Sequence, residues 1–183
     1  MALARDSFCS YCGTKYDAPH AYPRTCPGCK YQTWANPIPV GVTIVPVVDG
    51  GRTGVLVVRR NLPPKIGKLA LPGGFLEEHE AWNIGAAREV REETGVEIDT
   101  DLEQLIWRSS SPRPNRLLLF CVAKPVDASG FPSFEVDAET QERGLIYGPD
   151  GLDDEFAFDL HVEATRRYFA SRGITGPHAF AKK

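Results

Sequence analysis

Three glutamates at helical spacing are the first candidates for chemistry. Glu89 precedes Glu92 by three residues and Glu93 by four, so an α-helix would project all three carboxylates from one side. Like charges at this spacing repel, and a helix gains from them only when a cation lies among them. Mg²⁺ or Mn²⁺ fits such a site, because these hard ions bind carboxylate oxygens and bridge to phosphates. The bound ion would neutralise a diphosphate and lower the pKa of an attacking water.

Two neighbouring features bear on this interpretation. Gly73 and Gly74 come before the acidic segment, and glycine lets the backbone approach closely, so the Gly74 carbonyl is a further candidate ligand. The alternative is a solvated helix surface on which Arg88 and Glu92 form an ordinary ion pair four residues apart. Such charged segments are common on helices, so the six residues from Arg88 to Glu93 do not decide between the two hypotheses.

Four cysteines near the N-terminus form a second candidate site. They lie in two pairs, Cys9 with Cys12 and Cys26 with Cys29, and 13 residues separate the pairs. Four thiolates at this spacing make a closed tetrahedral Zn²⁺ site, which leaves no position for water and is therefore structural. Redox dithiols and buried thiols are the alternatives, but two matched pairs in a segment too small for its own core favour zinc. The fifth, Cys121, lies in an apolar segment and is predicted to be a buried thiol.

The elements that must position these residues alternate between strands and helices. β-branched residues and turn signals predict strands at 40–48, 54–59, 105–107 and 117–122, with a weaker one at 144–147. Helix-forming residues predict helices at 81–94, ended by Gly95, and at about 159–171, ended by Gly173. Strands interleaved with two helices predict an α/β sandwich.

Proline and glycine mark the boundaries between the parts of the chain. Asn36–Pro39 is expected to be an extended linker, because the residue before a proline is pushed away from the α region. We therefore expect a zinc-binding segment at 1–36, a catalytic domain at 37–172, and a partly mobile tail at 173–183.

Length and composition indicate one globular domain with a small appendage. The chain has 183 residues, of which 42% are hydrophobic and 25% charged. With 21 basic and 24 acidic residues the net charge is -3, so no strong positive field indicates nucleic-acid binding. The N-terminus lacks the apolar stretch of a signal peptide, and no apolar run is long enough for a membrane span, so we expect a cytoplasmic protein.

Over a longer span, the segment from Gly74 to Val96 resembles the Nudix box. Glu80 follows Gly74 after five residues, and the run from Arg88 to Val96 follows after seven more, in agreement with every fixed position of the motif. Leu71-Pro72-Gly73 is also similar to the usual lead-in. The resemblance implies a Nudix α/β/α sandwich around a mixed sheet at 37–172, preceded by a small zinc ribbon. It also implies water attack on phosphorus in a nucleoside diphosphate linked to another group.

The resemblance carries site residues with it. It assigns the catalytic metal ligands as the carboxylates of Glu89, Glu92 and Glu93, assisted by the carbonyl of Gly74. Arg88 and Glu80 match positions that brace the loop–helix–loop. Many family members add a glutamate outside the box as general base or metal ligand, and Glu139 or Glu142 is the candidate here, although surface charge is the alternative for each.

The cysteine segment together with Asn36–Pro39 resembles a ribbon-bearing Nudix subgroup, the NADH pyrophosphatases and relatives that act on FAD or ADP-ribose. Ser110–Pro114 lacks the Gln and Trp of the NADH-type signature, which favours a substrate of ADP-ribose or FAD type. Arg113, Arg116 and Arg59 are candidates for phosphate contact, because guanidinium pairs bidentately with phosphate, although each also fits an ordinary surface position. Homodimers are common among relatives, but no residue pattern here indicates one.

Two other functions stay open at this stage. Some Nudix-like domains sense ligands or bind other proteins without catalysis, and others are nucleoside triphosphate pyrophosphohydrolases. Non-catalytic members commonly lose box carboxylates, whereas Glu89, Glu92 and Glu93 are all present here. The sequence therefore favours an enzyme.

Overall fold

The computed structural model describes residues 6–17, 21–102, 104–112 and 115–183. Its internal contacts divide the chain after Pro37 into a small N-terminal unit and a larger unit that begins at Ile38. No helix in the described ranges is long and apolar enough to cross a membrane.

The N-terminal unit contains little regular structure. Strand β1 (Arg24–Thr25) pairs antiparallel with β2 (Gln32–Thr33), and each has only two residues. The buried apolar cluster consists of Cys9, Tyr16 and Cys26. A cluster of this size cannot offset the conformational entropy that the segment loses on folding, so the unit needs another source of stability.

The larger unit contains a four-stranded sheet. One of its strands holds Gly73 and Gly74, which are called the glycine approach to the acidic helix below. The strand order is β7 (Gly73–Phe75), β3 (Ile38–Ile44), β9 (Asn115–Val122) and β8 (Gln104–Pro112). β3 and β9 are parallel, whereas β7 with β3 and β8 with β9 are antiparallel. The sheet is therefore mixed.

A second sheet lies beside the first. Its path runs through β10 (Val126–Asp127), β4 (Pro46–Asp49), β5 (Arg52–Arg60), β11 (Thr140–Ile146) and β12 (Phe180–Lys182), and β6 (Leu69–Ala70) also pairs with β5. β10 and β4 are parallel and the other pairs antiparallel. A 3-10 helix, η1 (Ala128–Gly130), follows β10.

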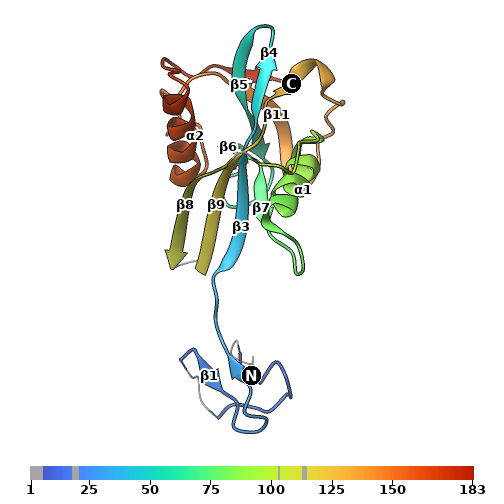
Figure 1. Cartoon of the computed structure of the whole chain (residues 1–183), viewed down its shortest axis with the longest axis vertical. Coiled ribbons are helices and arrows are strands. Elements are labelled where there is room, and N and C mark those ends of the chain that lie inside the picture. Colours follow the sequence, from blue (N-terminus) through green and yellow to red (C-terminus); the bar gives the residue numbers. More distant parts are fainter. Residues whose placement is uncertain (1–5, 18–20, 103, 113–114) are drawn as a thin grey trace. The chain divides into compact units, whose positions relative to one another are not determined.

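Two helices flank the sheets on opposite sides (Figure 1). Helix α1 (Trp82–Thr94) contacts β3, β7 and β11, and α2 (Asp159–Ser171) contacts β8. One buried cluster joins α2 to the sheets through residues such as Phe120 and Phe169, and another joins α1 to them through Val90 and Leu145. The predicted α/β sandwich is confirmed.

The structure corrects two expectations. The strand predicted at 40–48 is interrupted at Val45, so that β3 and β4 belong to different sheets. The segment 173–183, predicted to be a partly mobile tail, contains β12, which pairs with β11. Gly144 on β11 allows this pairing, because a side chain at that position would overlap the Phe180 ring.

Candidate functional site

Helix α1 carries the acidic segment and ends where the sequence predicts. Gly95 adopts the left-handed conformation, with φ of 72°, and its N–H donates to the Arg91 carbonyl at 2.7 Å. Ala86, Ala87 and Val90 are buried, which fixes the rotation of the helix about its own axis. Glu89 and Glu93, which follow these buried residues by about one helical turn, therefore hold defined positions at the margin of the core.

Strand β7 brings two glycines against this helix. The Gly73 N–H donates to a Glu93 carboxylate oxygen at 3.0 Å. A side chain at Gly74 would overlap the Glu89 carboxylate, and one at Gly73, where φ is 155°, would overlap the Gly41 carbonyl on β3. Both positions need glycine because β7 packs tightly between β3 and the carboxylates of α1.

Arg88 braces the segment through four partners. Its Nε donates to Glu80 at 2.9 Å, and its Nη1 donates to Glu89 at 2.9 Å and to Glu92 at 2.8 Å. Its Nη2 donates to the Phe75 carbonyl at 3.0 Å, which ties the helix to the end of β7. Arg88 holds the pKa of Glu80 below its usual range. The bracing role that the resemblance implies for Arg88 and Glu80 agrees with these contacts.

Glu89 and Glu93 lie where negative charge is poorly compensated. Burial raises the pKa of Glu89 even though Arg88 contacts it, and its side chain is only 14% exposed. Burial raises the pKa of Glu93 to about 8, and the charges of Glu89 and Glu139 add to this effect. A hard dication would offset the unfavourable energy of the two carboxylates, so these residues fit a Mg²⁺ or Mn²⁺ site.

Glu92 has different surroundings. Its side chain is 52% exposed and pairs with Arg88 at 2.8 Å and Arg91 at 3.8 Å. The surface ion pair considered as the alternative interpretation is thus present. The carboxylates of Glu89, Glu92 and Glu93 do not gather closely: among the described residues, only the cysteines bring three or more ligand atoms within 4.8 Å of one another.

Glu139 lies outside α1, and its charge affects two glutamates of the acidic helix. It acts on the pKa of both Glu89 and Glu93, and its side chain is exposed. Glu142, the other candidate, instead pairs with Arg59 at 2.8 Å and is largely shielded from solvent. The structure therefore favours Glu139 over Glu142 as the additional carboxylate.

The arginines expected to contact the phosphates of the substrate differ in their surroundings. Arg59 is engaged by Glu142 and by a backbone carbonyl at 2.9 Å. Arg116 lies on β9 with its guanidinium 4.5 Å from the centroid of the Phe75 ring, beside the end of β7. Arg113 lies outside the described residues. Of the two that are described, Arg116 is the one next to the glycine approach.

Arg60 is a charged residue whose influence on the site has no sequence pattern to mark it. Its positive charge lowers the pKa of Glu93, against the larger effect of burial. Its Nε donates to the Pro64 carbonyl at 3.0 Å, and its guanidinium lies 5.0 Å from the centroid of the Phe158 ring. Only its position at the end of a strand could have suggested a role.

The cysteines of the N-terminal unit converge on one point. Sulfur atoms of Cys9 and Cys29 are 3.8 Å apart, those of Cys12 and Cys26 are 3.7 Å apart, and all four lie within 4.8 Å of one another. Backbone N–H groups of Cys29 and Gly28 lower the pKa of Cys26 to about 6. The thiolate is the metal-binding form, so this donor set fits tetrahedral zinc.

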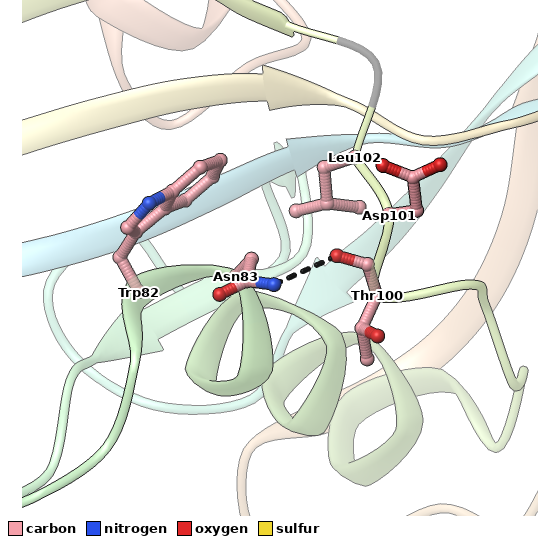
Figure 2. A pocket seen from close by; sticks show the side chains of 5 residues that line it. All are labelled: Trp82, Asn83, Thr100, Asp101 and Leu102. Carbon is pink, nitrogen blue, oxygen red and sulfur yellow. Dashed lines mark hydrogen bonds between the residues drawn. The ribbon is translucent and has the colours of Figure 1, made fainter.

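A pocket lies beside the first turn of α1 (Figure 2). It is lined by Trp82, Asn83, Thr100, Asp101 and Leu102. The Asn83 amide donates to the Thr100 carbonyl at 2.9 Å and fastens this loop to the helix. Asn83 comes six residues before Glu89 and ten before Glu93, about 9 and 15 Å along a helix axis, and neither glutamate lines the pocket.

Comparison with known proteins agrees with this architecture. Residues 37–152 match the family model of the NUDIX domain. The crystal structure of a NUDIX hydrolase from Nitrosomonas europaea aligns with a TM-score of 0.72 and 24% identity, over 91% of this chain and 92% of that one. A MutT/nudix family protein from Enterococcus faecalis aligns with a TM-score of 0.61 and 21% identity, over 76% of this chain and 63% of that one. The NUDIX domain of Shewanella oneidensis NrtR, solved with ADP-ribose, aligns with a TM-score of 0.59 and 17% identity, over 76% and 90% of the two chains.

The acidic helix and the paired glycines held against it lie within the residues that match the NUDIX model. The chain belongs to the Nudix family, because the family model matches more than half of its length. It is accordingly a hydrolase that acts on phosphorus-containing anhydrides.

Proposed function

We propose that this protein hydrolyses the diphosphate linkage of a nucleoside diphosphate derivative, of the ADP-ribose, FAD or NADH type, by metal-dependent attack of water on phosphorus. One observation carries the proposal: Glu89 and Glu93 are held against the backbone of Gly74 and Gly73 with their charge poorly compensated. A carboxylate pair in this condition is suited to a hard dication that shares its coordination with phosphate oxygens.

The residues have distinct roles in this proposal. The metal would be held by Glu89, Glu92 and Glu93 with the Gly74 carbonyl, and when bound it neutralises the diphosphate and lowers the pKa of a water. Glu139, which is exposed and whose charge acts on both Glu89 and Glu93, would accept the proton of the attacking water.

Groups beside these residues complete the site. Arg88 keeps Glu89 and Glu92 in place whether or not substrate is present, because its four contacts are all to the protein. Arg116, next to Phe75, is the candidate contact to the substrate phosphates, with Arg59 and Arg113 as further candidates.

We also assign Zn²⁺ to the four cysteines of the N-terminal unit. The sulfur geometry, the thiolate-stabilising amides at Cys26 and the lack of any other sizeable core in the described part of the unit support this assignment. With four protein ligands the ion has no open position, so its role is structural.

The type of substrate is supported by two observations. Ser110–Pro114 lacks the Gln and Trp of the NADH-type signature, and a similar NUDIX domain was solved with ADP-ribose. We therefore place ADP-ribose first among the substrates, ahead of FAD and NADH.

The test is product analysis on ADP-ribose, FAD, NADH and nucleoside triphosphates with Mg²⁺ or Mn²⁺. We expect release of a nucleoside monophosphate from ADP-ribose, and a kcat roughly 10²- to 10⁴-fold lower for Glu93→Gln. Glu163→Gln, an exposed glutamate on α2, is the matched control and should retain the wild-type rate.

Three results would contradict the proposal. Equal inactivity of wild type and Glu93→Gln on the whole panel, with ADP-ribose still bound, would identify a ligand sensor. Release of pyrophosphate from one nucleoside triphosphate in preference to the others would identify a triphosphate pyrophosphohydrolase. A Glu93→Gln variant as fast as wild type would remove the box carboxylates from the reaction.

A further inference from the structure

Asn61, the residue that follows β5, fastens the loop that carries Glu139. Its backbone N–H donates to the Glu139 carbonyl at 2.7 Å, and its side-chain Nδ2 donates to the Asp137 carbonyl at 2.6 Å. Its Oδ1 accepts from the Gln141 side chain at 3.1 Å. One asparagine thus contacts the chain before, at and after Glu139.

Asp137 closes the loop from within. Its Oδ1 accepts from the backbone N–H groups of Glu139 and Thr140, each at 2.7 Å, which is an Asx turn. The Asp137 N–H in turn donates to the Thr140 carbonyl at 3.1 Å. The backbone on both sides of Glu139 is therefore fixed, and Asn61 fixes this turn to the sheet.

The same contacts place the loop beside the acidic helix. Thr140 pairs with Arg60 on β5, and Arg143, further along β11, donates from Nη1 to the Thr94 carbonyl in the last turn of α1 at 2.6 Å. Glu139 thus enters β11 next to the end of the helix that carries Glu93. The Glu139 carboxylate has no hydrogen-bond or ion-pair partner among the residues that the structure describes, so nothing but its backbone directs it.

We propose that Asn61 is a positioning residue that acts through Glu139, holding the Glu139 loop so that its carboxylate stays close to Glu89 and Glu93. This inference rests on the proposed function, because it assumes that Glu139 serves the hydrolysis. Without the anchor the exposed loop gains conformational freedom, and the carboxylate spends less time in the productive geometry. The contacts of Asn61 in the structure are to the loop around Glu139, so its proposed role is to position that loop.

Hydrogen exchange tests the anchoring directly and needs no activity. Asn61→Ala removes both side-chain bonds, so exchange of the Glu139 and Thr140 amides is expected to accelerate at least tenfold. Asn83→Ala is the matched control, because the Asn83 amide fastens a different loop to the other end of α1 (Figure 2). In the control these two amides should exchange at the wild-type rate.

Kinetics on the substrate identified above tests the catalytic consequence. Asn61→Ala is expected to lower kcat roughly 10- to 100-fold with KM changed less than about twofold, since a misplacement of about 1 Å can cost that much. In a Glu139→Gln background the same substitution should lower kcat by less than about twofold, because the group it positions is already gone. A general loss of structure would lower activity in both backgrounds.

The outcomes separate this inference from the proposed function. If wild type is active and Glu139→Gln is impaired, a wild-type rate for Asn61→Ala, additive losses in the double variant, or unchanged exchange at Glu139 each overturns the inference alone. If Glu139→Gln retains full activity, the inference falls and the metal-dependent hydrolysis stands. If wild type is inert on every diphosphate, both fall together.

Discussion

The N-terminal unit and the Nudix domain each carry a set of candidate metal ligands, but the two sets relate to their surroundings in opposite ways. In the N-terminal unit the ligands are the core, since Cys9 and Cys26 are two of the three members of its buried cluster. In the domain the core is complete without the ligands, with side chains such as Leu56 and Phe169 fully buried. A metal is therefore expected to decide whether the first region folds, and only whether the second region reacts.

The two ligand sets also differ in how completely they surround a possible metal position. The four sulfur atoms lie within 4.8 Å of one another and surround a single point. In the box, Glu93 contacts Gly73, Glu89 lies against Gly74, and Glu92 turns to Arg88 in solvent. A closed set leaves no room for water, whereas an open one leaves room for water and phosphate oxygens. The difference agrees with the roles proposed above, a structural site for the cysteines and a catalytic site for the glutamates.

Loss of a zinc ligand should give the largest effect and tests the first half of the comparison. Cys26→Ser removes one of the four sulfur atoms from a site worth roughly 10 kcal/mol or more to such a segment. We expect one zinc per chain in the wild type and none in the variant. The amides of Cys9, Cys26 and Lys30, which are hydrogen-bonded in the structure, should lose their exchange protection while the Nudix domain keeps its urea midpoint.

Cys121→Ser is the matched control for this experiment. Cys121 is buried in β9, with its sulfur 3.4 Å from the Thr43 hydroxyl, so its loss should affect the domain alone. Protected amides at Cys9 and Cys26 in a zinc-free Cys26→Ser protein would show that the N-terminal unit folds without metal, and the contrast would fail.

Truncation of Arg88 should give the next largest effect. It tests the second half of the comparison, that the Nudix domain is held together without metal. Arg88 and Glu80 have side chains only 17% and 10% exposed, and removing one partner of such a pair leaves an uncompensated charge. We expect Arg88→Ala to lower the free energy of unfolding by about 3–5 kcal/mol in urea titrations. The loss should be the same in the presence of EDTA, because the protein alone builds this brace.

Arg166→Ala is the control, since Arg166 pairs with Asp153 and both are exposed. Its cost should stay below about 1 kcal/mol. Equal costs for the two variants would mean that the Arg88 brace stabilises the domain no more than a surface ion pair. A cost of Arg88→Ala that appears only with Mg²⁺ present would mean that the metal, and not the protein alone, holds the box together.

The parts of the fold that depend on local signals could be predicted from the sequence. The helix expected at 81–94 is Trp82–Thr94, and the one expected at about 159–171 is Asp159–Ser171, because helix formers and terminal glycines act within a few residues. Strands β6, β7 and β12 have two or three residues and exist only through their pairing partners. No local pattern of that length predicts a strand.

The site residues can also be divided into those that local sequence patterns reveal and those that depend on long-range pairing. The residue types and order of the cysteines and the box glutamates are visible in the sequence, as is the burial of Cys121, which the structure confirms. The distinction between Glu139 and Glu142 is not, because it depends on a register shift where β11 pairs with β5. Asn61 and Arg60 act across the same pairing, and no motif marks them.

The smallest expected effect concerns His161 on α2, whose ring supports the backbone just before Gly73 and Gly74. The Leu71 N–H donates to His161 Nδ1 at 3.1 Å, two residues before Gly73, so the ring must be neutral at that nitrogen. Burial lowers the pKa of His161 to about 3, whereas a histidine in an unfolded chain titrates near 6.5. If the N-terminal unit binds zinc as proposed, we expect it to respond to acid too, but through protons that displace the metal from thiolates.

The sign of the pH effect follows from these values. A depressed pKa in the folded state means that the stabilisation is complete above pH 6.5 and is lost as the pH falls towards 3, because only the unfolded chain takes up the proton. Between pH 7 and 5 the expected loss is about 2 kcal/mol. His161→Asn keeps an acceptor for Leu71 but cannot titrate, so its unfolding free energy should vary less over this range by about that amount. Urea unfolding followed by far-UV circular dichroism, to which the domain contributes most of the regular structure, measures the difference. Parallel pH curves for wild type and variant would show that His161 takes up a proton as readily in the folded protein as in the unfolded chain. Its bond to Leu71 would then not hold the backbone before Gly73.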